Sequence, residues 1–162
     1  MSQPDAIEAL RKLRIIIGAV RQHARALEES CGISGAQVWA LASIAHQTDI
    51  TVSQLSQALS VHISTASNLV DKLSRAGYIE RLRIEEDRRV VRLRLTQAGR
   101  ALIERAPAPL TGLIVDALDK MPAARLKTLN DDLGELIRHM NGIDPDAADI
   151  PLTALVDAHM RG

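Results

Sequence analysis

Residues 51–96, with the sequence TVSQLSQALSVHISTASNLVDKLSRAGYIERLRIEEDRRVVRLRLT, decide the fold of this 162-residue chain. Apolar residues recur there first at intervals of three and four and then at every second position. The first spacing predicts helices and the second predicts strands, because side chains on one face repeat at those intervals. The stretch is therefore expected to form a helix, a tight turn, a second helix and a two-stranded hairpin.

Cap and turn residues within this stretch support the order of elements. Thr51 precedes the first helix, and Gln54 stands at the capping-box position three residues later. The second helix is predicted from Ile63 to Ala76, and Gly77 ends it. A short helix braced across another, with a hairpin beside them, is a winged helix-turn-helix. The buried side of the second helix is expected to hold Ala66, Leu69, Val70 and Leu73.

The predicted hairpin pairs residues 78–83 with residues 90–95 and has its tip at residues 85–87. Its bases between positions 81 and 94 are six arginines and no lysine, and the planar guanidinium suits contacts with phosphates and base edges. Arg92 and Arg94 lie within a strand, so pairing across the hairpin with Glu80 or its neighbours is an equal alternative for them.

The exposed side of the second helix carries small polar and basic residues. Such a helix fits the DNA major groove, where asparagine can bind adenine through two hydrogen bonds. An arginine-bearing hairpin tip suits the narrow minor groove, and lysine and arginine on the helix suit phosphates. His62 is expected either to cap the helix or to touch a phosphate. The predicted site for double-stranded DNA comprises His62, Ser64, Thr65, Ser67, Asn68, Lys72 and Arg75 on the helix and Arg88 and Arg89 on the wing.

Long helices are predicted before this stretch. Apolar residues at helical spacing run from residue 6 to about residue 29, and Gly32 follows as a stop. Ile15 and Ile16 widen the apolar surface of this helix beyond one face, so it is expected to contact more than its own core. Ser34 then caps a helix that ends near His46.

Further helices are predicted after the hairpin. A helix that starts after Thr96 is interrupted by Pro107 and Pro109. A last long helix begins at Pro122 and is expected to end at Gly142. Apolar residues in the remaining tail, residues 143–162, predict either a short docked helix or a frayed terminus.

The composition excludes several classes of function. Aromatic residues make up 1% of the chain, too few for a stacking platform that binds single-stranded nucleic acid. A single cysteine cannot form an internal disulfide, and the five histidines show no metal-ligand spacing, so no metal or other cofactor is expected. No nucleophile elbow, phosphate loop or dinucleotide-binding motif is present, so the sequence predicts no catalytic residue and no enzyme.

Charge is distributed unevenly although the net charge of the chain is zero. Residues 50–100 hold nine Lys or Arg and five Asp or Glu, whereas residues 101–162 hold six and ten. The basic middle fits a nucleic-acid contact. The longest apolar run is far shorter than the ~20 residues that a membrane helix needs, and no targeting segment is recognised, so a cytoplasmic protein without a membrane partner is expected.

Two stretches resemble the MarR family of winged-helix regulators. They are residues 60–81, which span the second helix and the start of the hairpin, and residues 87–99, with an Asp-x-Arg wing and a Leu-Thr-x-x-Gly entry to the next helix. The resemblance covers about residues 6–141. It implies that Arg89 enters the minor groove and that Asp87 steadies it. His62, Ile63 and Asn68 depart from the residues common in the family, so its base contacts do not transfer to this chain.

The resemblance also implies a mainly α-helical homodimer in which the terminal helices of both subunits interlock. Residues 1–33 and 100–142 would form the helical dimerisation region, residues 34–99 the DNA-binding domain and residues 143–162 a C-terminal extension. The operator would be pseudo-palindromic, with half-sites ~34–36 Å apart. The expected function is a repressor that a small-molecule effector releases from DNA.

Residues for sensing are less well defined by the sequence. Trp39, with Ile17 and His23, is a candidate for lining an effector pocket, although Trp39 is favoured as an aromatic core anchor. Some members of the family sense oxidants through a cysteine on the first helix. Cys31 follows Glu28 and Glu29, which disfavour a thiolate, so a packed structural thiol is favoured over an oxidant sensor. A winged-helix module that binds only protein is the other alternative to a DNA-binding regulator.

Overall fold

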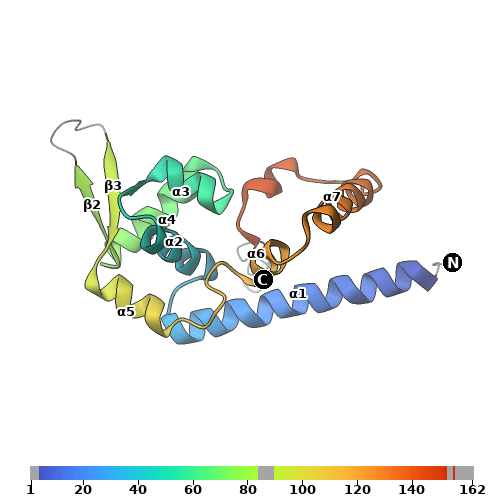
Figure 1. Ribbon diagram of the computed structural model, residues 1–162, viewed down its shortest axis with the longest axis horizontal. Helices are drawn as coiled ribbons and strands as arrows, with labels where there is room; N and C mark the ends of the chain where they lie inside the picture. The colour runs from blue at the N-terminus through green and yellow to red at the C-terminus, as the bar shows by residue number, and fades with distance from the viewer. Residues whose placement is uncertain (1–3, 84–89, 153–154, 156–162) are drawn as a thin grey trace.

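The computed structural model describes residues 4–83, 90–152 and 155 of the chain. A winged-helix lobe lies at one end, and the long helix α1 (Pro4–Cys31) leads away from it (Figure 1). The chain is mainly helical with a small antiparallel sheet, as the sequence predicted. Within the described residues, no helix combines the length and the apolar character needed to cross a membrane.

Three helices form the centre of the lobe: α2 (Gly35–His46), α3 (Val52–Leu59) and α4 (Ile63–Arg75). Both predicted capping boxes are present. The Ser34 hydroxyl accepts a hydrogen bond from the Gln37 backbone N–H, and Thr51 does the same for Gln54. These side chains satisfy N–H groups that the first turn of a helix leaves without partners, which fixes where α2 and α3 begin.

The core of the lobe is continuous from α1 to α5 (Gln97–Arg105). The buried side of α4 is the one predicted from the apolar spacing, and α3 packs across it. Burial of such side chains is the main favourable contribution to folding. The largest fully buried side chains are Leu27, Leu41, Ile44, Ile50, Leu55, Leu73, Leu93 and Leu102.

Over the residues that the structure describes, the sheet has three strands, whereas the sequence predicted two. The predicted hairpin is formed by β2 (Ile79–Arg83) and β3 (Val91–Leu95), with Ile79 opposite Leu95. A short strand β1 (Ile50–Thr51) pairs with the other edge of β3 and gives the order β1-β3-β2. A strand of two residues leaves no periodicity in the sequence, so only its pairing with β3 reveals it.

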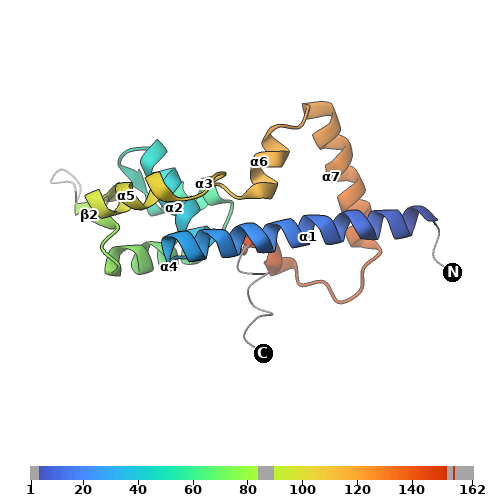
Figure 2. The same ribbon diagram turned by 90° about the horizontal axis from the view of Figure 1, so that it is seen from below.

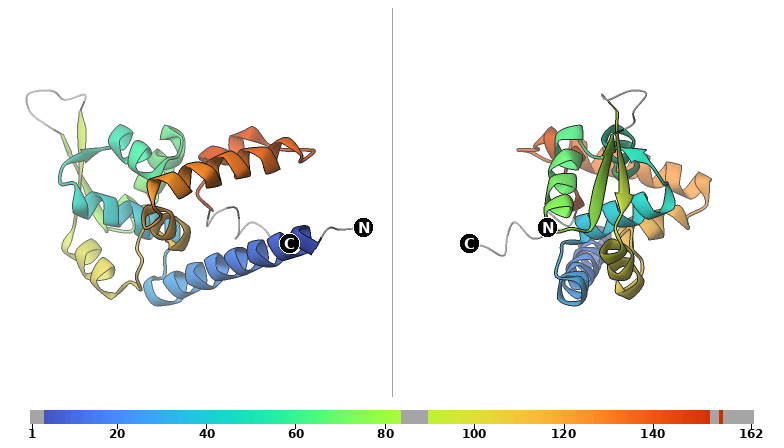
Figure 3. Two further views of the ribbon diagram at one scale, coloured as in Figure 1. Left: turned by 45° about the vertical axis from the view of Figure 1, so that its right-hand side comes forward. Right: turned by 90° about the vertical axis from the view of Figure 1, so that its left-hand side faces the viewer.

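The hairpin is joined closely to α5, and its two strands lead away from that helix in both views of Figure 3. Thr96 caps α5 by accepting a hydrogen bond from the Gly99 N–H, and its hydroxyl donates to the Gly77 carbonyl oxygen at 2.7 Å. A Cβ atom on Gly99 would collide with the Tyr78 carbonyl oxygen, so only glycine permits this approach of helix and strand. The Thr-x-x-Gly spacing therefore sets the position of the wing against the lobe.

The C-terminal helices contribute little to the core. α6 (Leu113–Asp119) lies against α1, and α7 (Ala123–Arg138) follows it; neither contains a buried residue. The prediction that the last helix extends to Gly142 was wrong. The backbone N–H groups of His139 and Met140 bond three residues back instead of four, so the helix tightens and ends before Gly142 is reached.

The C-terminal extension turns back toward the lobe (Figure 2). It contains a short 3-10 helix, η1 (Pro145–Asp149), that begins after Asp144. The predicted apolar set of the tail begins at Leu152, and most of it lies outside the described residues. Whether a longer helix docks there stays a prediction.

Candidate nucleic-acid interface

The polar side of α4 faces solvent along its whole length. Ser64, Asn68, Lys72 and Arg75 are exposed or half-exposed, and Thr65 and Ser67 are half-buried. The opposite side packs on α3 and the sheet, which holds the helix in place without using its polar residues. The structure thus brings six of the predicted DNA-contacting side chains to one accessible surface, which we call the α4 polar face.

His62 precedes the first turn of α4, but it does not cap the helix. Its Nε2 atom lies 3.0 Å from the Asp149 carboxylate oxygen Oδ2 in η1, and both side chains remain about half exposed. Of the two roles expected for His62, capping is not seen, because the imidazole reaches the returning C-terminal extension instead, and contact with a phosphate stays a prediction. No signal in the sequence pairs two residues so far apart.

The base of the wing is held by Asp49, which sequence reasoning did not single out. The Arg94 guanidinium donates to both Asp49 carboxylate oxygens, with Nε to Oδ1 at 2.5 Å and Nη2 to Oδ2 at 2.9 Å. Arg92 donates from Nη1 to the Asp49 backbone carbonyl oxygen at 2.9 Å. Hydrogen bonding to Arg94 lowers the pKa of Asp49 below its ordinary value of 3.8.

These contacts give Arg92 and Arg94 a role at the base of the wing, and contact of either arginine with DNA stays a prediction. Glu80 stands opposite Arg94 in the strand register, yet the hydrogen-bonded partner of both arginines is Asp49, just before β1. The predicted pairing within the sheet is therefore correct in kind but wrong in partner. The error follows from the missed strand β1, since β1 is what brings Asp49 alongside β3.

A second ion pair joins the wing to α4. Arg81 on β2 donates to the Asp71 carboxylate on α4. This pair fixes the hairpin against the helix and offsets the one acidic charge on the side of α4 that would approach an anionic polymer. The wing residues Asp87, Arg88 and Arg89 lie outside the described residues. The strands β2 and β3 that lead to them stand at the end of the molecule opposite the free end of α1 (Figure 1).

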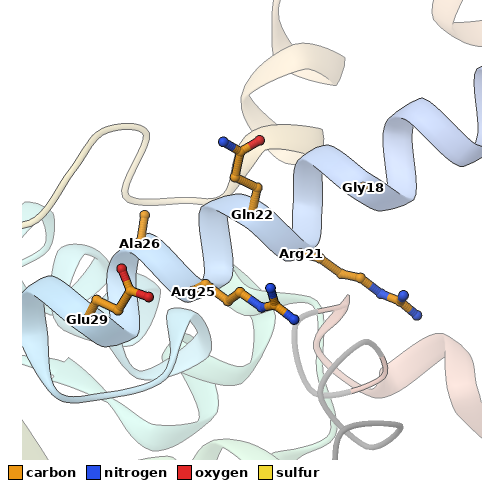
Figure 4. Close-up of a pocket in the computed structure, with 6 residues that line it drawn as sticks. All are labelled: Gly18, Arg21, Gln22, Arg25, Ala26 and Glu29. Carbon is orange, nitrogen blue, oxygen red and sulfur yellow. The ribbon is translucent and has the colours of Figure 1, made fainter.

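None of the three residues predicted for an effector pocket lines the hollow that the structure shows along α1. Trp39 is half-buried and packs against the core, which is the role we favoured for it. Ile17 is exposed on α1, and His23 contacts the Pro109 carbonyl oxygen through Nε2 at 3.0 Å. An open hollow of about 490 Å³ lies along α1 nearby, lined by Gly18, Arg21, Gln22, Arg25, Ala26 and Glu29 (Figure 4).

The structure does not support oxidant sensing by Cys31. Cys31 is buried, and burial raises the pKa of its thiol, while Arg105 acts in the opposite direction. A thiol with a raised pKa is a weak nucleophile, which favours a structural role over oxidant sensing. In the part of the chain that the structure describes, no three His, Cys, Asp or Glu side chains are grouped so as to hold a metal ion.

Comparison with known proteins gives a consistent set of similarities. Residues 33–91 match the MarR family. The chain is 45% identical over 56 residues to the HTH-type transcriptional regulator PecS of Dickeya dadantii, covering 35% of this chain and 34% of PecS. It is 29% identical over 94 residues to the uncharacterized HTH-type transcriptional regulator YsmB of Bacillus subtilis, covering 58% of this chain and 64% of YsmB. The chain thus spans about a third and somewhat under two thirds of these two relatives.

Solved structures show the same fold over most of the chain. A MarR family protein from Bacillus stearothermophilus superposes with a TM-score of 0.54 at 27% identity, covering 86% of this chain and 98% of that one. A cysteine-to-serine mutant of MarR from E. coli, complexed with operator DNA, gives a TM-score of 0.53 at 26% identity and covers 84% and 99%. The relatives and structures named here are transcriptional regulators or MarR-family proteins, and the winged helix-turn-helix is confirmed as the fold.

Proposed function

We propose that the chain is a transcriptional regulator of the MarR family and that it binds a pseudo-palindromic operator in double-stranded DNA as a homodimer. The observation that carries the proposal is the α4 polar face. It is accessible along its length, it ends in Lys72 and Arg75, and it lies beside an arginine-rich hairpin. A helix of this kind can enter a major groove while the hairpin tip reaches the adjacent minor groove.

The proposal of a homodimer rests on apolar surface that this chain does not cover by itself. The first half of α1 contains no buried residue, and its large apolar side chains are exposed. Contiguous apolar surface of this kind marks an interface. A second copy of the chain would bury the exposed residues of α1 (Ile7, Leu10, Leu13, Ile15, Ile16 and Ile17) and of the C-terminal helix and the residues after it (Leu133, Leu136, Ile137 and Met140).

Repression and release by an effector belong to the same proposal. The hollow along α1 has a volume typical of small-molecule sites, and Arg21 and Arg25 point from α1 to the same side of it in Figure 4. The two guanidinium groups suit a small anionic effector, and the lining also includes the acidic Glu29. To release DNA, such an effector must have a higher affinity for the conformation of the protein that cannot bind DNA than for the conformation that binds it.

Selection from randomised duplex DNA, followed by sequencing of the retained fraction at several salt concentrations, tests the DNA-binding proposal. We expect a pseudo-palindrome whose affinity falls steeply with salt, because phosphate contacts release counterions. Lys72→Ala and Arg75→Ala should each weaken binding to every sequence and reduce the salt slope by about 1 per subunit, or about 2 for the homodimer. Arg125→Ala, which removes the same charge from exposed α7, is the matched control and should leave both unchanged.

Two outcomes would contradict the proposal. A folded dimer that retains no DNA at low salt would favour a module that binds only protein. Asn68→Ala should relax the base preference at one position of each half-site by about 1–3 kcal/mol. An unchanged preference in that variant would show that the α4 polar face is not the surface that reads the bases.

A further inference from the structure

Ile63 is exposed in a part of the molecule where other large apolar side chains are buried or half-buried. Its exposed fraction is 58%. Among the described residues of 33–105, it is the one exposed large hydrophobic side chain. The others lie in α1 or after residue 132, outside the lobe. The packing of the lobe therefore does not explain the residue.

The position of Ile63 on α4 indicates what its side chain could contact. It is the first residue of α4, next to the exposed Ser64 and one turn before the half-buried Ser67. Its β-branched side chain is not favoured in a helix, so helix formation does not require it either. Residues at the N-terminal end of a recognition helix are the ones that reach base edges in the major groove.

We propose that Ile63 recognises thymine through its 5-methyl group, an inference that rests on the proposed DNA binding. An isoleucine side chain has no hydrogen-bonding group, so it can discriminate bases only by apolar contact. In the major groove the 5-methyl group of thymine is the apolar feature that separates the four bases. Ile63 would therefore specify thymine at one position of each half-site, next to the positions that Ser64 and Asn68 read.

Replacing single thymines of the selected operator by uracil tests this inference, because uracil lacks only the methyl group and keeps every hydrogen bond. For the wild-type protein we expect about a fourfold loss of affinity at one position per half-site, the loss typical of one buried methyl group. Ile63→Ser should bind thymine and uracil operators equally at that position. Ile63→Val, which keeps a branched apolar side chain, should retain the discrimination.

The controls separate this inference from the proposed function. Binding that is salt-dependent but indifferent to uracil at every thymine would overturn the role of Ile63 and leave DNA binding intact. An equal uracil penalty in the wild type and Ile63→Ser would assign the methyl contact to another residue. Absence of DNA binding by all three proteins would overturn the proposed function itself. Thermal melting of the variants should match the wild type, since Ile63 is exposed.

An independent observation at the same end of α4 concerns the C-terminal extension. Asp149 places a carboxylate oxygen 3.0 Å from His62 Nε2, across 87 positions of sequence. Figure 2 shows the chain returning from α7 to this side of the lobe. Anions are favoured at the N-terminal end of a helix, and a DNA phosphate would be favoured there for the same reason.

We infer that residues 144–149 compete with DNA for the N-terminal end of α4, an inference that also rests on the proposed DNA binding. Asp144 and Asp146 bring two further acidic charges to the same segment. The contact must open when DNA is bound, so it lowers the affinity for every sequence alike. The N-terminal end of α4 is thus an interaction surface that a segment of the same chain occupies when DNA is absent.

Asp149→Asn tests the competition, with Asp146→Asn as the matched control for the loss of one charge in the same segment. Asp149→Asn should raise DNA affinity about twofold to fivefold more than Asp146→Asn, the range expected from one exposed polar contact. Without DNA, it should also shift the amide resonances of Ile63 and Ser64 more than Asp146→Asn does. Equal affinities for the two variants would overturn the inference. Loss of DNA binding by the wild type would instead overturn the proposed function.

Discussion

The winged-helix lobe and the terminal helices differ in whether the chain buries its own apolar side chains. In the lobe, α2, α3 and α4 bury their apolar sides, and side chains cap α2 and α3. In α6 and α7 no residue is buried, and the first sixteen residues of α1 contain no core residue. A region that folds by its own packing is thus joined to one whose apolar residues need another surface. Stability should depend on sequence differently in the two regions.

The largest expected effect is a loss of stability in the lobe. Leu41 in α2 is completely buried, so Leu41→Ala should lower the free energy of unfolding by about 2–5 kcal/mol through lost burial and the cavity that remains. Leu136→Ala, on α7 where the side chain is 45% exposed, removes the same atoms from the other region. Denaturant unfolding of the lobe should respond to the first variant and hardly to the second. Equal losses would erase the contrast between the regions.

The next effect concerns association. Ile16→Glu places a charge in the middle of the exposed apolar surface of α1, so it should raise the dissociation constant of the proposed homodimer at least about tenfold. Sedimentation of the wild type and variant over a concentration range measures this change. Circular dichroism should show that the lobe still melts cooperatively. A variant that stays dimeric would place the interface elsewhere.

A smaller effect is expected at the start of α2. Ser34→Ala removes the side chain that accepts from the Gln37 N–H, and it should cost about 1 kcal/mol of unfolding free energy. Ser34→Asp, which can cap equally well, should restore most of that loss. If both variants unfold at the same denaturant concentration as the wild type, the capping box contributes nothing to the stability of the lobe.

The smallest expected effect is a loss of stability of the wing at low pH. Because Arg94 lowers the pKa of Asp49 in the folded chain, the ionised carboxylate stabilises the wing at pH values above its unfolded pKa, and this contribution is lost as the pH falls through the folded pKa. The protection of β3 amides against hydrogen exchange, taken relative to the intrinsic exchange rate at each pH, should therefore fall in acid below the ordinary pKa of 3.8 in the wild type. Asp49→Asn should show the reduced protection already at neutral pH and little further change in acid.

Local chemistry explains which features the sequence could predict. The Ser34 and Thr51 caps, the stop at Gly77 and the alternation through β3 depend on residues a few positions apart, and the structure confirms each of them. These signals also placed the side chains of the α4 polar face at the surface. They act through the backbone of a single helix or strand, so no knowledge of the tertiary structure was needed.

Features that depend on distant pairing could not be predicted in the same way. β1 exists because Ile50 and Thr51 meet Leu93 and Arg92 across 43 and 41 positions. The partner of Arg94 followed from that pairing, and the partner of His62 from the return of the C-terminal extension. Nothing in the sequence close to Asp49 or Asp149 marks either residue as part of a site. The exposure of Ile63 likewise became visible only once the rest of the lobe was seen to bury its large apolar residues.

The length of α1 has a mechanical consequence. Its 28 residues make a rod about 42 Å long at the usual helical rise. Its core contacts are confined to the C-terminal part, where Val20, Ala24, Leu27 and Cys31 are buried and His23 holds Pro109. The helix α1 is therefore fixed to the core at its C-terminal part alone. A tilt of about 5° there would move its N-terminal end by about 4 Å. In the proposed homodimer, such a small tilt would be enough to change the distance between the two copies of α4 by a few ångströms.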